Sequence, residues 1–120
     1  MKYFCIVLLT LLFTVPSMAQ DSDDNSRTST FYFIRHAEKD RSDKTNKNPN
    51  LTEKGKQRAE KWSQVLKHVK FDAVYSTDYN RTMQTAQPTA NANKLVLSMY
   101  DPRNIDAKAF LRDNKGKTVL

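Results

Sequence analysis

The sequence predicts an α/β fold, a three-layer open and mainly parallel sheet with helices on both faces. Short runs of β-branched and aromatic residues alternate along the chain with longer segments whose apolar residues recur at helical spacing. Strands that alternate with helices build parallel sheets through crossover connections. A further apolar run starts at Thr118 and is cut at Leu120. We therefore expect the sheet to be incomplete on its C-terminal side.

Residues 1–19 have the pattern of a secretory signal peptide. Lys2 precedes an apolar run, and Ser17 and Ala19 supply small residues before a cleavage site. A membrane-spanning helix needs about 20 apolar residues, and this run is shorter. We expect an exported, periplasmic or extracellular protein with no stable membrane anchor after cleavage. Residues 20–29 are polar and predict a disordered leader, which leaves one domain over residues 30–120.

Cysteine and histidine are scarce in this chain. Cys5 is the single cysteine and lies inside the apolar run of the signal, so the exported chain has no disulfide and its stability must come from packing. The two histidines, His36 and His68, are far apart and have no second ligand at metal-binding spacing. We predict no metal and no other cofactor.

The chain is basic, with a formal net charge of +7. Such an excess favours phosphorylated or polyanionic partners through long-range steering, although a solvated basic surface is the more ordinary interpretation. Exposed aromatic residues interleaved with the basic ones are lacking, so no nucleic-acid partner is predicted. The expected partner is a small phosphorylated substrate.

The first predicted elements are a strand, a loop and a helix. Residues 30–34 form a continuous β-branched and aromatic run, typical of a strand buried on both faces. Residues 37–50 are polar and charged and predict a binding loop, with substrate selectivity expected in residues 40–50. A helix is expected after Thr52 as N-cap, with Leu51 as a hydrophobic staple. Its predicted apolar face comprises Ala59, Trp62, Val65, Leu66 and Val69.

The later elements continue the alternation. Strands are predicted over residues 71–75 and 94–99, and helices over residues 79–90 and about 107–114. Ligands of such sheets bind at the carboxyl ends of the strands. Two polar segments lie there, one directly after the first strand and one after the second, and we expect their side chains to converge.

These two segments carry a family resemblance. The first reads Arg35-His36-Ala37-Glu38, and it resembles the Arg-His-Gly-Glu of the histidine phosphatase (phosphoglycerate mutase-like) superfamily, with alanine in place of glycine. Two further family segments, Leu-Thr-x-x-Gly-x-x-Gln-Ala and Ser-x-x-x-Arg-Ala-x-Gln-Thr-Ala, are matched in the same order. The matching residues are Leu51, Thr52, Gly55 and Ala59, then Thr77, Arg81, Gln84, Thr85 and Ala86, with Arg58 where glutamine is usual.

The resemblance implies roles for individual residues. His36 would be the nucleophile that takes the phosphoryl group, because a neutral imidazole nitrogen needs no separate base. Arg35 and Arg81 would bind the phosphoryl oxygens, which guanidinium groups fit in bidentate fashion. Glu38 and Thr77 are further candidate substrate-binding residues.

Two catalytic groups of the family are harder to place in this sequence. Asp101 is the first candidate for the general acid, and Asp106 is the next. The family also has a second histidine after a later strand, and no residue after Arg81 can take that role. The negative φ required of Ala37, where the family has glycine, is a milder departure.

The resemblance therefore implies a histidine acid phosphatase-like phosphomonoester hydrolase. It would act through a phosphohistidine intermediate on a phosphorylated compound outside the cytoplasm. The alternative is a catalytically inactive phosphate-binding module, either a pseudoenzyme or a truncated fragment. Because a sheet that lacks a strand has an unpaired edge and an uncovered apolar face, we expect the chain ending at Leu120 to be poorly soluble and weak in catalysis.

Overall fold

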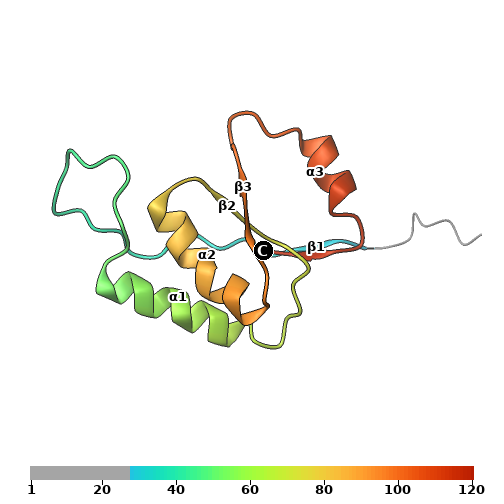
Figure 1. The fold of residues 1–120 in the computed structure, drawn as a ribbon, viewed down its shortest axis with the longest axis horizontal. Helices are drawn as coiled ribbons and strands as arrows, with labels where there is room; N and C mark the ends of the chain where they lie inside the picture. The colour runs from blue at the N-terminus through green and yellow to red at the C-terminus, as the bar shows by residue number, and fades with distance from the viewer. Residues whose placement is uncertain (1–27) are drawn as a thin grey trace, which may run out of the picture.

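The computed structural model describes residues 28–120. The predicted signal peptide, and all but the last two residues of the predicted leader, lie outside the described residues. Strands and helices alternate as the sequence predicts, with the first and last strands being very short (Figure 1). In chain order the elements are β1 (Thr30–Phe31), α1 (Glu53–Val65), β2 (Val74–Thr77), α2 (Asn80–Ala92), β3 (Leu97–Tyr100), α3 (Ala107–Asp113) and β4 (Thr118–Val119).

The strands are parallel, and the last one in sequence lies in the middle. β1 pairs with β4, and β2 pairs with β3. A parallel bridge between Ala73 and Val119 joins the two pairs. Beside it the amide of Tyr75 donates to the carbonyl oxygen of Leu120 at 2.8 Å. The order across the sheet is therefore β1, β4, β2, β3, which confirms the predicted parallel sheet.

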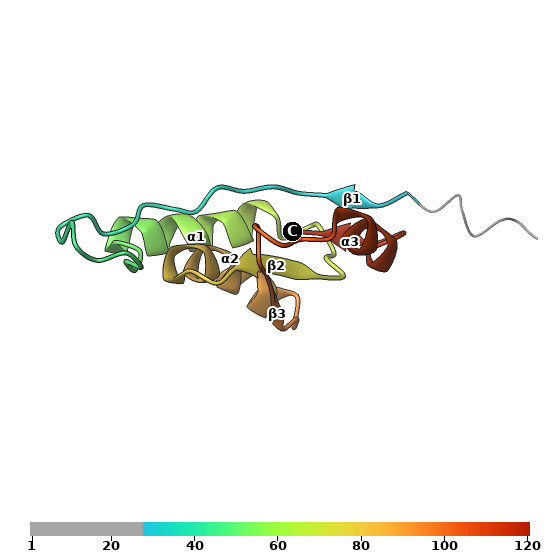
Figure 2. The same cartoon turned by 90° about the horizontal axis from the view of Figure 1, so that it is seen from above.

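Helices cover both faces of this sheet. Successive side chains of a strand point to opposite faces of the sheet. Val74 and Tyr75 of β2 therefore lie on different faces. Val74 is fully buried in a cluster with Ala86 and Ala90 of α2. The Tyr75 ring packs edge-on against Phe110 of α3, with ring centroids 4.9 Å apart. Figure 2 shows α1 and α2 side by side, with α3 beside β1. The predicted three-layer architecture is confirmed.

Helix α1 begins as predicted but buries a different line of residues. Thr52 is its N-cap, and its hydroxyl accepts a hydrogen bond from the amide of Gly55 at 3.0 Å. The buried residues of the helix are Gly55, Ala59 and Ser63, one turn apart, whereas Val65 is 60% exposed. Small side chains allow α1 and α2 to approach closely. The expectation that Val65 faces the core is wrong for this reason.

All three predicted strands differ from their expected bounds, and β2, expected over residues 71–75, spans Val74–Thr77. β1 was expected over residues 30–34, but Tyr32 makes the last contact to β4, its amide donating to the carbonyl oxygen of Val119 at 2.8 Å. Further along there is no paired strand, and Phe33 is 91% exposed, so the predicted burial on both faces is wrong there. β3 starts late because Lys94, with a φ of 56°, closes α2 in a left-handed turn.

Within residues 28–120, no helix has the length and apolar character needed to cross a membrane.

Candidate active site

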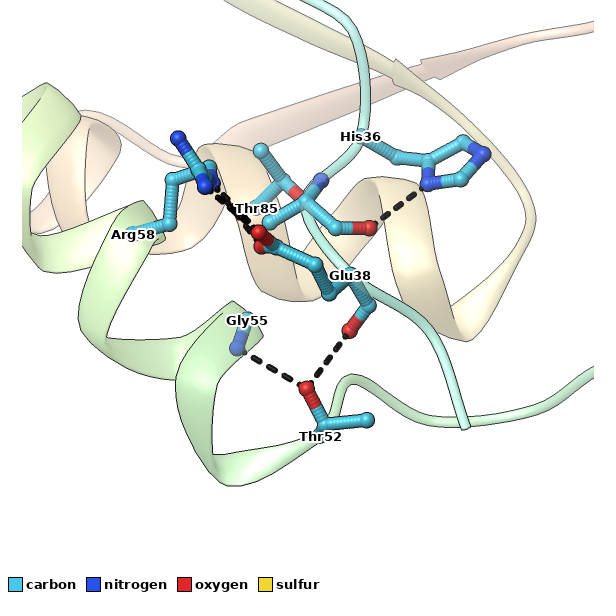
Figure 3. Close-up of polar contacts among 7 residues, drawn as sticks. His36, Glu38, Thr52, Gly55, Arg58 and Thr85 are labelled. Carbon is cyan, nitrogen blue, oxygen red and sulfur yellow. Dashed lines mark hydrogen bonds and ion pairs between the residues drawn. The ribbon is translucent and has the colours of Figure 1, made fainter. Parts of the chain in front are cut away.

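His36 follows β1 and is held by its own neighbour in the chain. Its Nδ1 lies 2.7 Å from the carbonyl oxygen of Ala37 (Figure 3). Because a carbonyl oxygen can only accept, Nδ1 must carry the proton in this contact. In the neutral ring the lone pair is then on Nε2. The local backbone thus selects the tautomer in which Nε2 is free to act as a nucleophile.

A buried threonine attaches this segment to α2. The amide of Ala37 donates to Oγ1 of Thr85 at 2.9 Å, and the same hydroxyl donates to the carbonyl oxygen of Arg81 at 2.7 Å. Ala37 and Thr85 are 3% and 2% exposed. Ala37 also has a negative φ as predicted, since Lys94 is the only non-glycine residue of the described part with a positive one. The family segment that contains Arg81 and Thr85 therefore anchors the backbone beside His36.

Glu38 points toward α1 and not toward the His36 ring (Figure 3). Its two carboxylate oxygens accept from Nε of Arg58 at 2.9 and 2.8 Å. Hydrogen bonds from the Arg58 side chain are the main cause that lowers the pKa of Glu38 to about 2. The backbone carbonyl of Glu38 accepts from the amide of Thr52 at 2.8 Å. These contacts fit a residue that positions the segment better than one that binds an anionic substrate.

Gly55 allows α1 to approach this segment. A Cβ at Gly55 would lie 2.2 Å from the carbonyl oxygen of Glu38 and 3.1 Å from the Cβ of Leu51. The first distance is far below any real carbon contact, and the atom it meets belongs to the backbone. The glycine of the Leu-Thr-x-x-Gly segment is therefore required by this close approach.

Arg81 lies in the first turn of α2 with an unpaired buried nitrogen. Its guanidinium carbon is 4.3 Å from the centroid of the Tyr79 ring, a cation–π contact. Nη1 is buried and has no hydrogen-bond partner. A buried donor without a partner costs about 1–3 kcal/mol, and an anion bound there would remove this cost.

Two hollows meet at His36. The first is a largely apolar cavity of about 200 Å³ whose lining includes His36, Thr77 and Thr85. The second is shallow and basic, and it is lined by Arg35, His36, Ala37, Glu38, Lys39, Arg41 and Arg58. His36 thus shares the apolar cavity with Thr77 and the basic hollow with Arg35. Arg81 lines neither of these two hollows.

The two candidate acids are engaged in local capping. The carboxylate of Asp101 accepts from the amide of Arg103 at 2.9 Å and from Nδ2 of Asn104 at 2.7 Å. The backbone hydrogen bond from Arg103, followed by that from Asn104, lowers the pKa of Asp101. Asp106 is the N-cap of α3 and accepts from the amide of Ala109 at 3.0 Å. Neither carboxylate lines the hollows at His36, so the geometry does not favour either as the general acid.

Sequence reasoning matched Gln84 and Thr85 to the family segment but gave them no role. Oε1 of Gln84 accepts from the amide of Leu51 at 2.8 Å, and its Nε2 donates to Oδ1 of Asn50 at 2.9 Å. Together with Thr85, Gln84 holds both loops of the site against α2. Their structural role could have been predicted, because these two polar residues lie in the same helix as the apolar Ala86 and Ala90. Buried polar groups need hydrogen-bond partners.

Comparison with known proteins agrees with this arrangement. The model of the histidine phosphatase superfamily (branch 1) matches residues 31–103, which is more than half of the chain. The chain therefore belongs to the histidine phosphatase superfamily. No curated protein matches it.

Several solved structures share the fold. A putative phosphohistidine phosphatase SixA from Agrobacterium tumefaciens aligns with a TM-score of 0.59 and 21% identity over 75% of this chain and 66% of that one. Bacillus stearothermophilus YhfR aligns with a TM-score of 0.53 and 29% identity, over 76% of this chain and 46% of that one. Phosphoserine phosphatase from Entamoeba histolytica aligns with a TM-score of 0.52 and 22% identity, over 75% of this chain and 55% of that one. The chain spans less than two thirds of the length of each, and the likeness shows a phosphoglycerate mutase-like fold.

Proposed function

We propose that this chain acts as a phosphomonoester hydrolase through a phosphohistidine on His36. The observation that carries the proposal is the hydrogen bond from Nδ1 of His36 to the carbonyl oxygen of Ala37 at 2.7 Å, which leaves Nε2 unprotonated in the neutral ring. Membership of the histidine phosphatase superfamily and the phosphatases among its structural neighbours support it.

The reaction would proceed in two displacements at phosphorus. In the first, the Nε2 lone pair of His36 forms a P–N bond while the bond from phosphorus to the ester oxygen breaks. The electron pair of that bond goes to the leaving oxygen, which takes up a proton from solvent water to become the alcohol. In the second, water attacks phosphorus, the P–N bond breaks and its electrons return to Nε2. The water loses a proton, and inorganic phosphate leaves.

The arginines would stabilise the charge that spreads over the phosphoryl oxygens. Arg35 is exposed in the basic hollow beside His36. Arg81 has a buried Nη1 that lacks a partner, and an anion would supply one. We assign Glu38 and Thr77 to positioning. Glu38 is tied to Arg58, and the Thr77 hydroxyl donates to Oγ1 of Thr82 at 3.0 Å. Our proposal gives Asp101 no catalytic role, because its hydrogen bonds favour the ionised form.

We place the reaction outside the cytoplasm on the signal-like pattern of residues 1–19. Fusing residues 1–29 to a reporter enzyme that is active only after export tests this part by itself. Reporter activity that survives replacement of the apolar run by a polar one would overturn it.

A phosphate-binding module without turnover is the second candidate. The observation that favours it is that neither Asp101 nor Asp106 lines the hollows at His36, so a proton donor for the leaving oxygen is missing among the proposed residues. The two candidates differ in whether phosphohistidine forms and turns over.

The test is labelling of the purified chain with a radioactive phosphomonoester, quenched in alkaline detergent so that a phosphohistidine survives, together with steady-state release of phosphate. We expect label that is acid-labile and base-stable, lost in His36→Ala and retained in the control variant His68→Ala. Phosphate binding without label or turnover would establish the binding module. Turnover in His36→Ala equal to that of the wild type would overturn the proposed nucleophile.

A further inference from the structure

The basic hollow beside His36 holds more positive charge than one phosphoryl group requires. We propose that its outer part, formed by Lys39 and Arg41, binds a second phosphate group, so that the preferred substrates are small bisphosphorylated compounds. This inference rests on the proposed function, because one of the two phosphates must reach His36. No residue assigned above to the transferred phosphoryl group is used for the second one.

The charge of the hollow is largely unneutralised. Its lining includes four cationic side chains and one carboxylate, that of Glu38. Only Arg58 among these cations has an ion-pair partner within residues 28–120, and that partner is Glu38. Arg35, Lys39 and Arg41 thus leave an excess of three positive charges. A phosphate group carries about −1.5 to −2 at neutral pH, so one transferred phosphoryl group does not neutralise this hollow and two do.

The two outer cations are held by an ordered loop base. Lys39 forms an antiparallel bridge with Leu51, and the amide of Asp40 donates to the carbonyl oxygen of Asn50 at 2.8 Å. In an extended segment alternate residues share a face, which places Lys39 and Arg41 on the same side. Backbone pairing at residues 39 and 40 therefore fixes the chain where the two cationic side chains leave it.

The far side of the same loop is attached to the helix that carries Arg81. Oδ1 of Asn48 accepts from the amide of Asn80, at the start of α2, at 2.8 Å. The loop over residues 40–50 is thus tied both to α1, through Leu51, and to α2. A second phosphate bound at its base would lie within the same hollow as His36, within reach of a short substrate.

Arg58 also lines this hollow. It uses Nε and Nη2 on Glu38, and its Nη1 has no hydrogen-bond partner within the described part of the chain. A guanidinium group has five donors in a fixed plane. Glu38 therefore holds Arg58 in place and neutralises its charge while a donor remains for a ligand oxygen.

Binding can be measured apart from turnover with unreactive phosphonates. We expect propane-1,3-diyl bisphosphonate to bind the purified chain at least about tenfold more tightly than propylphosphonate in calorimetry, the scale of one charge-assisted hydrogen bond. The difference should shrink as salt rises from 0.05 to about 0.5 M, since the cations are exposed and screened. Lys39→Gln and Arg41→Gln should each reduce this preference about threefold to tenfold.

Lys67→Gln is the matched control, because it removes an exposed lysine beyond the far end of α1, and it should leave the preference intact. Equal affinity for the two phosphonates, or a preference that survives both hollow variants, would overturn the inference. Tighter binding of 3-phosphonopropionate than of the bisphosphonate would overturn the assignment of a second phosphate in favour of a carboxylate.

Turnover distinguishes this inference from the proposed function. With propane-1,3-diyl bisphosphate and propyl phosphate as substrates, the ratio of kcat/KM values should favour the bisphosphate and fall in Arg41→Gln. If neither compound is hydrolysed but the bisphosphonate still binds preferentially, the proposed phosphatase activity fails and the anion site stands. If both are hydrolysed at equal kcat/KM, the anion site fails and the phosphatase stands.

Discussion

Two buried threonines of α2, one turn apart, should respond to the same substitution in opposite directions. Thr85 and Thr89 are 2% and 1% exposed. The hydroxyl of Thr85 accepts from Ala37 and donates to Arg81, whereas that of Thr89 has no partner. Replacement by valine keeps the size of each side chain and exchanges the hydroxyl for a methyl group. Helix propensity changes little, because the two residue types have similar values.

The expected free energies follow from these contacts. Thr85→Val loses two hydrogen bonds of about 1 kcal/mol each and leaves the buried amide of Ala37 unpaired, which costs about 1–3 kcal/mol. We expect the free energy of unfolding to fall by about 2–4 kcal/mol. Thr89→Val removes a buried hydroxyl without a partner, and the free energy of unfolding should rise by about 1 kcal/mol.

Urea titration and thermal unfolding of both variants check this pair. For a domain of this size each kcal/mol moves Tm by about 4–8 °C, so Thr85→Val should melt about 10–25 °C lower and Thr89→Val a few degrees higher. Turnover should fall in Thr85→Val alone, because the segment that carries His36 loses its anchor. Equal destabilisation by the two substitutions would refute the reasoning from hydrogen-bond partners.

Three further predictions concern the arginine, the glycine and the carboxylate of the site. Arg81→Gln should weaken vanadate binding by about 2–4 kcal/mol with little change in stability, since the cation–π contact with Tyr79 is lost while an unpaired buried Nη1 disappears. An unchanged vanadate inhibition constant would place Arg81 outside the site, and Arg81→Lys should rescue little. Gly55→Ala should lower the free energy of unfolding by about 1–3 kcal/mol through overpacking, although helix propensity alone predicts a gain of about 1 kcal/mol; a stabilised variant would contradict the contact with Glu38. The lowered pKa of Glu38, from 4.5 to about 2, gives stability that is present above pH 4.5 and lost as pH falls through 2. The stability difference between wild type and Glu38→Gln should therefore narrow between pH 5 and 2 in denaturant titrations. A constant difference would show that the Arg58 pair does not contribute.

Local features were predictable because their causes lie within a few residues. Thr52 caps α1 through a hydrogen bond to Gly55, three residues away, and this is a spacing that sequence displays directly. The α/β class followed from the alternation of apolar periods. The rule that strand ends of a parallel sheet carry ligands predicted that His36 and Thr77 lie close together, and both line one cavity. The signal peptide remains a prediction, since it lies outside the described residues.

Contacts between distant segments were decided by the tertiary structure alone. The hydrogen bond from Ala37 to Thr85 spans 48 residues, and no periodicity encodes such a pairing. β4 lies between β1 and β2. The sequences of the strands do not reveal which strands will be neighbours in the sheet, so this order could not be predicted.

The same limit explains the errors at single residues. Val65 fits the apolar period of α1 but is exposed, because the buried line of the helix is formed by the small residues Gly55, Ala59 and Ser63. Glu38 belongs to a family motif but pairs with Arg58 of α1, which lies twenty residues further along the chain. Sequence thus determined which residues could form the site. Packing between helices and sheet decided which of them line the hollows at His36, because side-chain partners are chosen by proximity in space and not by spacing along the chain.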